Sequence, residues 1–498
     1  MLAAVGALSL TLARADAAFA EKSGGILKMY IPDSTASMSI REESTVFAEG
    51  PMMGVFNNLV MFDQHIPQNS LQSVVPDLAT GWTWSEEGTE LTLPLREGVR
   101  WHDGKPFTAR DGQCTCDLLT GTSSEKLRVN TRKSWYQNLD RVTTNGDYEV
   151  TFHLKRPQPA FSPPSRPGSR RSFPATCRRA TCASIRSALA RSNLSGSSRT
   201  STSRLCATPI TGSKDRPILD GIEYTIIKNL STAVLALVSG KFDMAFPYSL
   251  TVPLLKDVKR QMPQAMCEMR PVGLNRGLIV SRDKPPFDNA ELRRAMALSF
   301  DRPAFIDILT EGEGDIGGVM QPLPAGLWGM PPEMLQALPG YDPDVRKNRA
   351  DASHIMQKLG YGPNNRLGIK VTARDLPYLR DTAVILIDQL KQVYIDAELE
   401  TIDTTNWFPK VMRKDYIVGI TGGQGGPDPD QNIHQLYGCG GELNYSGYCS
   451  PEADQLIEQQ SSTADQEKRK QLMWEIERRL AEDGARLIIF YDRRATCW

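Results

Sequence analysis

Alternating apolar and polar positions between residues 76 and 109 predict an antiparallel hairpin. Every second residue from Leu91 to Leu95 is leucine, and this period of two places the leucines on one face of a strand, toward a core. In the preceding run, Trp82 and Trp84 are also two residues apart, and a Glu-Gly turn separates the two runs. The pattern predicts a structural unit and no catalytic group of side chains.

From residue 222 onward, strand-like runs alternate with helix-like runs, an order typical of an α/β fold. The expected strands are residues 222–227, 278–281, 368–373, 398–402, 416–420 and 487–491. The expected helices include residues 231–238, 289–299, 349–359, 382–393, 451–460 and 467–482. Because 498 residues exceed what one core ordinarily holds, we expect at least two lobes.

The beginning of the chain has the pattern of an export signal. Leu2–Leu12 is an apolar run too short to span a bilayer, and the small residues up to Ala20 follow it. We expect a signal peptide over residues 1–20, cleaved after Ala20, and an exported mature protein. The alternative is a buried N-terminal helix. No later segment is long and apolar enough to cross a membrane.

The charge of the chain is balanced overall and uneven locally. With 58 basic and 58 acidic residues the formal net charge is zero, which gives no general attraction to nucleic acid or anionic membranes. Residues 162–213 are the exception, with nine arginines and no acidic residue. A nucleic-acid-binding function would rest wholly on this block. Because such a composition cannot build a core, we interpret the block as an irregular reading-frame artefact.

No motif in the chain predicts a cofactor or a metal. Residues 312–317 read GEGDIG, a literal G-x-G-x-x-G. A dinucleotide site needs a strand before this motif and a helix after it. Here a helical pattern precedes it, and Pro322 and Pro324 exclude a helix after it. P-loop, H-E-x-x-H and G-x-S-x-G patterns are absent, and the nine cysteines are not spaced as zinc ligands.

A glycine-rich run directly after the expected strand 416–420 is the best candidate for a binding site. Residues 421–430 read TGGQGGPDPD. Glycines after a strand end let backbone and ligand approach closely, and open α/β sheets bind ligands at the carboxyl ends of their strands. The candidate residues in this run are Gly422, Gly423, Asp428 and Asp430. The two aspartates could equally be turn formers.

Cys439 and Cys449 flank a Gly- and Asn-rich loop in a protein that we expect to be exported. Disulfides persist in such oxidising compartments. We therefore predict a disulfide between them beside the presumed ligand cleft, which would contribute about 2–3 kcal/mol by loop-closure arguments. The alternative is two free thiols.

Four stretches of the chain resemble a known protein family. The hairpin of residues 76–109, GIEYTIIKNLSTAVLALVSGKFDM at 221–244, KPPFDNAELRRAMALSFDR at 284–302 and NYSGYCSPEAD at 444–454 resemble the signature of the family 5 extracellular solute-binding proteins. These are the dipeptide- or oligopeptide-binding components of ABC importers. The stretches follow the family order and cover most of the chain, apart from residues 162–213.

The resemblance implies the two-lobed periplasmic-binding-protein fold, type II, of the large class with an extra subdomain. This is an α/β fold with mixed sheets and two hinge crossings, which we expect near Arg270–Asn275 and near Gly484–Leu487. The expected parts are lobe I (residues 21–60, 214–270 and 486–498), the extra subdomain of lobe I (61–161), the irregular block (162–213) and lobe II (271–485).

The implied function is that of a receptor and not of an enzyme. It would close two lobes over a small solute, a peptide or a similar polar compound, and deliver it to an ABC permease in the inner membrane. We expect it to act as a monomer, without nucleic acid. The alternative is a secreted hydrolase that uses His102 or His434 with nearby acids. Convergence of His, Ser, Cys and carboxylate side chains in a cleft would distinguish it.

The resemblance also implies which residues bind the solute. In dipeptide-binding relatives the glycine-rich run resembles T-G-D-x-G-D-P-D-N, whose first aspartate pairs with the free amine of the peptide. Gly423 takes the place of that aspartate here. Arg374 matches the residue that holds the ligand carboxylate, a group that suits a guanidinium. Trp407 matches an aromatic wall. The alternatives are a surface charge for Arg374 and a core position for Trp407.

Two departures from the family remain. The start of residues 162–213 can be back-translated with GC-rich codons and translated again in a frame shifted by one nucleotide. The resulting amino-acid sequence resembles the family again, so we predict two compensating single-nucleotide shifts. The family normally continues for some tens of residues beyond the position of Trp498, so we also predict a truncated C-terminus.

Overall fold

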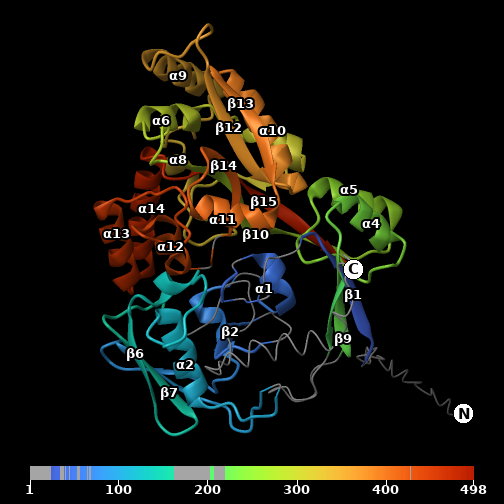
Figure 1. Ribbon diagram of the computed structural model, residues 1–498, viewed down its shortest axis with the longest axis vertical. Coiled ribbons are helices and arrows are strands. Elements are labelled where there is room, and N and C mark those ends of the chain that lie inside the picture. Colours follow the sequence, from blue (N-terminus) through green and yellow to red (C-terminus); the bar gives the residue numbers. More distant parts are fainter. Residues whose placement is uncertain are drawn as a thin grey trace, which may run out of the picture.

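The computed structural model (Figure 1) describes residues 24–33, 39, 41–43, 45–52, 56–63, 65–66, 69–101, 103–161, 202–206, 219–424, 426 and 428–498. The expected signal peptide lies outside these ranges, as do His102 and most of residues 162–213. Among the described residues, no helix combines the length and the apolar character needed to cross a membrane.

A six-stranded mixed sheet forms the centre of lobe II, with the strand order β11-β15-β10-β14-β12-β13. β12 runs parallel to β13 and β14, and the other neighbours are antiparallel. The strands are β10 (Cys267–Val280), β11 (Gly314–Asp315), β12 (Leu367–Arg374), β13 (Ile395–Ile402), β14 (Val418–Gln424) and β15 (Leu487–Cys497). The G-x-G-x-x-G run supplies only the short β11, which pairs with β15.

Helices cover this sheet because each turns an apolar face toward it. On β12, Leu367, Ile369 and Val371 are buried, and Gly368 and Lys370 between them are exposed. The three buried side chains pack with the inner face of α10. The helices begin at side-chain caps such as Asn289 and Asp301. The helices of lobe II are α6 (Ala290–Leu298), α7 (Arg302–Thr310), α8 (Pro332–Leu335), α9 (Val345–Lys358), α10 (Pro377–Lys391), α11 (Thr404–Met412), α12 (Ile433–Tyr437), α13 (Pro451–Ser462) and α14 (Gln466–Glu482).

Lobe I contains a small sheet in which β1 (Ile26–Ile31) pairs in parallel with β9 (Gly221–Ile226). The helices α4 (Leu230–Val238) and α5 (Val252–Gln261) lie beside it, and α1 (Val46–Met52) faces lobe II (Figure 1). β8 (Thr202–Cys206) pairs antiparallel with the second edge of β9. These five residues belong to the block 162–213, which we expected to be irregular with few strand pairings. They form one such pairing, because the open edge of β9 offers its backbone groups to an extended segment.

The extra subdomain contains the hairpin predicted from residues 76–109. Its antiparallel sheet has the order β4-β5-β7-β6, with Trp84 opposite Leu91. Leu91 and Leu93 are fully buried, and Trp84 packs against Phe161. The elements are β2 (Val60–Phe62), β3 (Val74–Pro76), β4 (Thr83–Trp84), β5 (Glu90–Pro94), α2 (Ala109–Thr120), β6 (Leu139–Thr144) and β7 (Glu149–Leu154).

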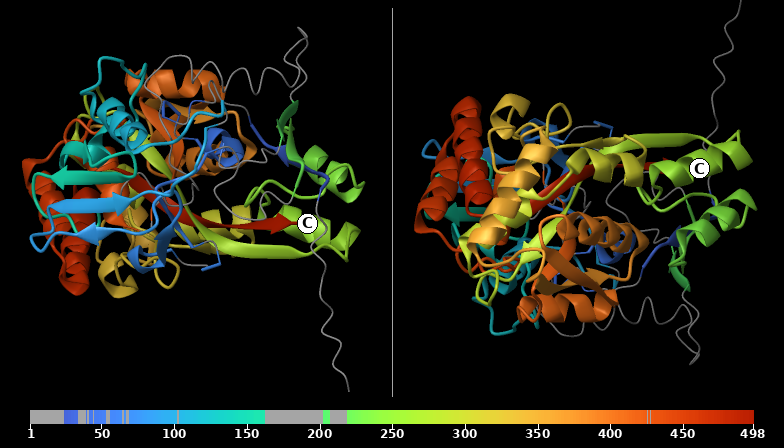
Figure 2. Two further views of the ribbon diagram at one scale, coloured as in Figure 1. Left: turned by 90° about the horizontal axis from the view of Figure 1, so that it is seen from below. Right: turned by 90° about the horizontal axis from the view of Figure 1, so that it is seen from above.

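The chain passes between the lobes along two long antiparallel strands, β10 and β15, which lie side by side in both views of Figure 2. The register shifts between Pro271 and Asn275, within the first expected crossing. Pro271 is paired with Arg493. Because the two strands are paired side by side, they pass from one lobe to the other at the same level. The second crossing therefore lies near Arg493. The expected position, Gly484–Leu487, is wrong, because Leu487 pairs with Leu278 inside the central sheet of lobe II.

A disulfide that the sequence did not predict joins the lobe I ends of the two crossing strands. Cys267 and Cys497 are paired across β10 and β15, with a sequence separation of 230. Cys116 on α2 is a buried free thiol. Burial raises the pKa of the Cys116 thiol to about 12, so it stays protonated and unreactive.

Glu477 on α14 should make the stability of lobe II depend on pH. Its side chain is 1% exposed and accepts hydrogen bonds from the backbone N–H groups of Met320 (2.7 Å) and Met330 (3.1 Å). Burial raises its pKa from 4.5 to about 7. The folded state therefore holds the proton more tightly than the unfolded state, and the stability that this provides below about pH 4.5 is lost as the pH rises to about 7.

From this shift we expect Glu477 to lower the free energy of unfolding by roughly 3 kcal/mol between these pH values. Urea unfolding of the wild type and of Glu477→Gln, measured over this pH range, isolates the effect, since glutamine does not titrate. Equal pH dependence of the two proteins would contradict the assignment.

Candidate functional site

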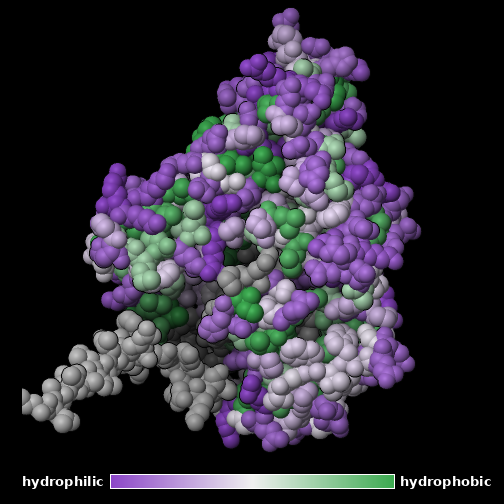
Figure 3. All heavy atoms as spheres, turned by 180° about the vertical axis from the view of Figure 1, so that it is seen from behind, coloured by the Kyte–Doolittle hydropathy of each residue, from purple (hydrophilic) through white to green (hydrophobic). Residues whose placement is uncertain are grey.

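A cavity of about 180 Å³ lies between lobe I and lobe II. Residues 45–47, Thr131, Arg132 and Trp135 line it from one side. From lobe II it is lined by the end of β12, by β14, by the start of α12 and by residues 443–446 and 485–486. In Figure 3 the back of the molecule is mostly hydrophilic and is hollowed near its middle.

The two lobes touch around this cavity. Trp135 Nε1 donates to Gln435 Oε1 (3.3 Å), and Gln158 Nε2 donates to Asp430 Oδ2 (2.9 Å). These contacts join residues of the extra subdomain to residues of lobe II, so the structure holds the lobes in a closed arrangement.

Arg374 ends β12 and lines the cavity. Its side chain is 8% exposed, and its guanidinium lies 5.5 Å from the ring centre of Phe408. Nε is buried without a hydrogen-bond partner, and no described residue forms an ion pair with this guanidinium. A buried charge without a counter-ion is costly, so the arrangement suits an acidic group of a bound solute.

Gly422 and Gly423 also line the cavity, but as strand residues and not as a loop. β14 continues to Gln424, and Gly423 pairs with Asn275 of β10. The Gly423 N–H donates to Asn275 Oδ1 (3.2 Å). A Cβ at position 423 would lie 2.3 Å from Arg486 Nη2. Glycine therefore leaves room here for the guanidinium of Arg486.

Arg486 is a cavity residue that the sequence did not predict. Its Nη2 donates to Asn275 Oδ1 (3.4 Å), and its guanidinium also donates a hydrogen bond to the hydroxyl of Tyr437. Its Nε is buried without a hydrogen-bond partner. The only sequence signal is a single arginine directly before the apolar strand that starts at Leu487. Nothing in that pattern indicates that it reaches β14.

Asp428 and Asp430 do not line the cavity. Asp428 is 2% exposed and accepts from both terminal nitrogens of Arg469, at 3.0 and 2.9 Å. Asp430 accepts from Gln158 and from Ser461, each at 2.9 Å. Both carboxylates are thus engaged within the protein, where they hold the segment after β14 against α13 and α14.

Trp407 does not reach the cavity either. It is 1% exposed and packs with Ile279, Val411 and Tyr416. The next residue of α11, Phe408, lines the cavity. Because successive helical residues point about 100° apart, the aromatic wall comes from Phe408, and the sequence-based assignment of that wall to Trp407 is one position off.

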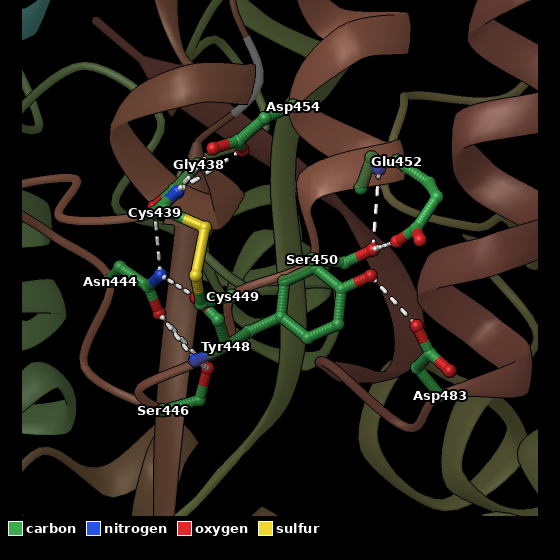
Figure 4. Close-up of a disulfide and its surroundings, with 11 residues drawn as sticks. Gly438, Cys439, Asn444, Ser446, Tyr448, Cys449, Ser450, Glu452, Asp454 and Asp483 are labelled. Carbon is green, nitrogen blue, oxygen red and sulfur yellow. Dashed lines mark hydrogen bonds between the residues drawn. A yellow bond between two sulfur atoms is a disulfide. The ribbon is translucent and has the colours of Figure 1, made fainter.

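Cys439 and Cys449 form a disulfide with a Cα–Cα distance of 4.5 Å (Figure 4). Inside the loop that it closes, Asn444 Nδ2 donates to the carbonyl oxygens of Gly438 (3.0 Å) and Tyr448 (2.6 Å). The same loop supplies Tyr445 and Ser446 to the cavity wall. The disulfide therefore fixes one wall of the cavity.

The described side chains near His434 do not form the catalytic arrangement of a hydrolase. Its Nδ1 lies 3.4 Å from Gln137 Nε2, and within the described ranges no serine, cysteine or acid hydrogen-bonds the ring. His102 lies outside those ranges. The part of the chain that the structure describes contains no cluster of His, Cys, Asp and Glu that could hold a metal ion.

Comparison with protein families decides the class. The model of the bacterial extracellular solute-binding proteins, family 5 Middle, matches residues 73–175 and 212–444. The chain belongs to this family. It is a solute-binding receptor of an ABC importer, and the hydrolase alternative is not supported. The unmatched residues 176–211 fall inside the arginine-rich block 162–213.

Individual relatives agree with this class. Di/tripeptide-binding protein 1 of Pseudomonas aeruginosa is 24% identical over 452 residues, which cover 84% of this chain and 80% of that protein. The oligopeptide-binding protein AppA from Bacillus subtilis, solved with a nonapeptide, has a TM-score of 0.79 at 18% identity over 96% of this chain and 94% of that one. AgaA from A. tumefacien R10, solved with agropinic acid, has a TM-score of 0.77 at 18% identity over 95% and 93%. These structures confirm the two-lobed α/β fold.

Proposed function

We propose that the protein captures a small solute with a carboxylate between its two lobes and delivers it to the permease, and that Arg374 binds the carboxylate. The observation that carries this proposal is the buried guanidinium of Arg374, which faces the interlobe cavity without a partner among the described residues. A planar guanidinium binds a carboxylate through two parallel hydrogen bonds.

The size of the cavity supports a small solute. Its volume is about 180 Å³, whereas clefts for drug-sized ligands hold roughly 300–1,000 Å³. Relatives are named for di- and tripeptides, and solved structures of similar fold hold a nonapeptide and agropinic acid. A compound of dipeptide size or smaller fits the closed cavity of this chain, and a nonapeptide does not.

In the proposed mechanism, the solute stabilises the closed form. The lobes move about the crossings of β10 and β15, and the solute contacts Arg374 and Gly422 in lobe II and Trp135 in the extra subdomain. A ligand that touches both lobes shifts the equilibrium toward closure by its extra affinity for that state. The permease then recognises the closed receptor.

We further propose that the protein acts in the periplasm as a monomer, after cleavage behind Ala20. The apolar run Leu2–Leu12 and the small residues after it support export, and the zero net charge supports the absence of a nucleic-acid partner. Residues 162–213 remain a proposed reading-frame artefact, which the gap in the family match at 176–211 supports. Translation of the coding DNA in its other frames tests this interpretation.

Replacing Arg374 by methionine should reduce the affinity for the solute by about 30-fold or more, since loss of one partner of a buried charge pair costs about 2–5 kcal/mol. Native mass spectrometry of the purified protein identifies a co-purified solute and its occupancy. The wild type should carry it, and Arg374→Met should not.

The matched control is Arg380→Met. Arg380 follows on α10, is exposed and pairs with Asp375 (3.1 Å), so its loss should leave the occupancy unchanged. A solute retained equally by Arg374→Met and the wild type would refute the proposed role of Arg374.

A further inference from the structure

The interlobe cavity carries positive charge that nothing in its described lining neutralises. Three arginines line it, and no aspartate or glutamate does so in the described part of the chain. Arg132 is compensated by Glu49, whose Oε1 lies 2.8 Å from its Nη2. Arg374 and Arg486 have no acidic partner among the described residues.

Most positions outside the described residues hold no acid, and the exceptions are Asp16, Glu21 and Asp215. Positions 34–38, 40, 44, 53–55, 425 and 427 contain no aspartate or glutamate, and neither does the block 162–213. Within the described part of the chain, the two cavity arginines therefore lack a counter-charge, which an acidic solute can supply.

The tyrosines of the cavity do not provide a negative charge for the two arginines. Burial raises the pKa of Tyr445, although the charges of Arg374 and Arg486 act against this, and the same cause raises the pKa of Tyr437. Both hydroxyls stay protonated and can only donate or accept hydrogen bonds. The charges of Arg374 and Arg486 both act on the Tyr445 hydroxyl, so the two guanidiniums lie near the same part of the cavity.

Position 423 determines which groups this end of the cavity accepts. A side chain there would collide with the Arg486 guanidinium at 2.3 Å, and glycine avoids the collision. The backbone N–H of Gly423 and the Nη2 of Arg486 both donate to Asn275 Oδ1, at 3.2 and 3.4 Å. These two donors share a neutral acceptor, the amide oxygen of Asn275, and a solute ammonium would meet the Arg486 cation with no carboxylate in the described lining.

We infer that the solute carries two acidic groups and no ammonium, with one carboxylate on Arg374 and a second on Arg486. This inference rests on the proposed function and extends it from a solute with a carboxylate to a dianionic one. Aromatic side chains that also line the cavity, such as Phe408, Tyr378 and Tyr445, contact the uncharged body of the solute.

Three compounds that differ by single groups test the charge preference. N-acetylglutamate has two carboxylates and no ammonium. N-acetylglutamine replaces one carboxylate by an amide, and glycylglutamine adds an ammonium to it. Binding is measured on the full-length protein by the fluorescence change of its tryptophans, because Trp135 lines the cavity, and by the rise in unfolding temperature at millimolar compound.

The wild type should bind N-acetylglutamate at least about tenfold more tightly than N-acetylglutamine, since a hydrogen-bonded charge contributes about 1.5–3 kcal/mol. Glycylglutamine should bind most weakly. Arg486→Gln should remove the difference between the two acetylated compounds. Arg479→Gln, which changes a partly exposed arginine of α14 that pairs with Glu475, should leave it unchanged.

A second variant keeps Arg486 in place. In Gly423→Asp, the new carboxylate pairs with Arg486, whose flexible end can move away from the added Cβ, and the preference for N-acetylglutamate should fall by the same factor. Both variants are checked for a native unfolding transition before binding is compared.

Preference for glycylglutamine, equal binding of the two acetylated compounds, or no binding of any of the three would overturn the inference of a dianionic solute. An unchanged preference in Arg486→Gln would overturn the role of Arg486. These outcomes are separate from the test of the proposed function, which fails only if the co-purified solute remains bound to Arg374→Met.

Discussion

Replacing Arg469 by methionine should lower the free energy of unfolding by about 3–5 kcal/mol, because it leaves a buried carboxylate without its partner. Arg469 and Asp428 are 3% and 2% exposed and share two hydrogen bonds at 3.0 and 2.9 Å. Arg469 also donates to Gln460 (2.9 Å), and its guanidinium lies 4.7 Å from the ring centre of Trp328. Urea unfolding followed by circular dichroism measures the change.

Lys470→Met is the matched control, since Lys470 is the next residue of α14 and forms an ion pair with the exposed Glu467 (2.7 Å). Its loss should change the stability by less than about 1 kcal/mol. Adding Asp428→Asn to Arg469→Met should recover part of the loss, which a double-mutant cycle measures. If Arg469→Met kept full stability but lost solute binding, Asp428 would be a binding residue, against the assignment made from its contacts.

The sequence predicted the elements whose signal is local. The leucines from Leu91 to Leu95 alternate because one face of their strand is buried, and this alternation is visible without any partner strand. The α/β alternation after residue 222 is equally local. Arg374 could be proposed only from the resemblance to the family, which matches it to the residue that holds the ligand carboxylate, and the structure places it at the end of β12.

The sequence could not predict features that depend on pairing across the chain. Asp428 and Asp430 follow a glycine-rich strand end as ligand-binding acids would, but their role depends on α14, which brings Arg469 to them. Arg486 is held at the cavity by its hydrogen bond to Asn275. Asn275 belongs to β10 and pairs with Gly423 of β14. Cys267 and Cys497 are paired because β10 and β15 run antiparallel, which no spacing rule indicates.

Replacing Asp492 by asparagine should lower the free energy of unfolding by about 3–5 kcal/mol, because it leaves two buried guanidiniums without a counter-ion. Asp492 is 1% exposed, with Arg276 Nη2 2.8 Å from Oδ1 and Arg494 Nη2 2.9 Å from Oδ2. Burial alone would raise the pKa of Asp492, but the two arginines hold it below its ordinary value, so it is ionised at neutral pH.

The position of this cluster explains why its loss should reach the binding site. Arg276 on β10 also donates to the carbonyl oxygen of Tyr378 (3.0 Å) and to Thr382 Oγ1 (2.9 Å) of α10, and Tyr378 lines the cavity. Asp492→Asn should therefore speed hydrogen exchange in β10 and β15 together with its loss of stability. Asp396→Asn, which removes an exposed partner of Arg366 at 2.9 Å, should change the stability by no more than about 1 kcal/mol. A similarly small effect of Asp492→Asn would show that the cluster does not stabilise the strands that join the lobes.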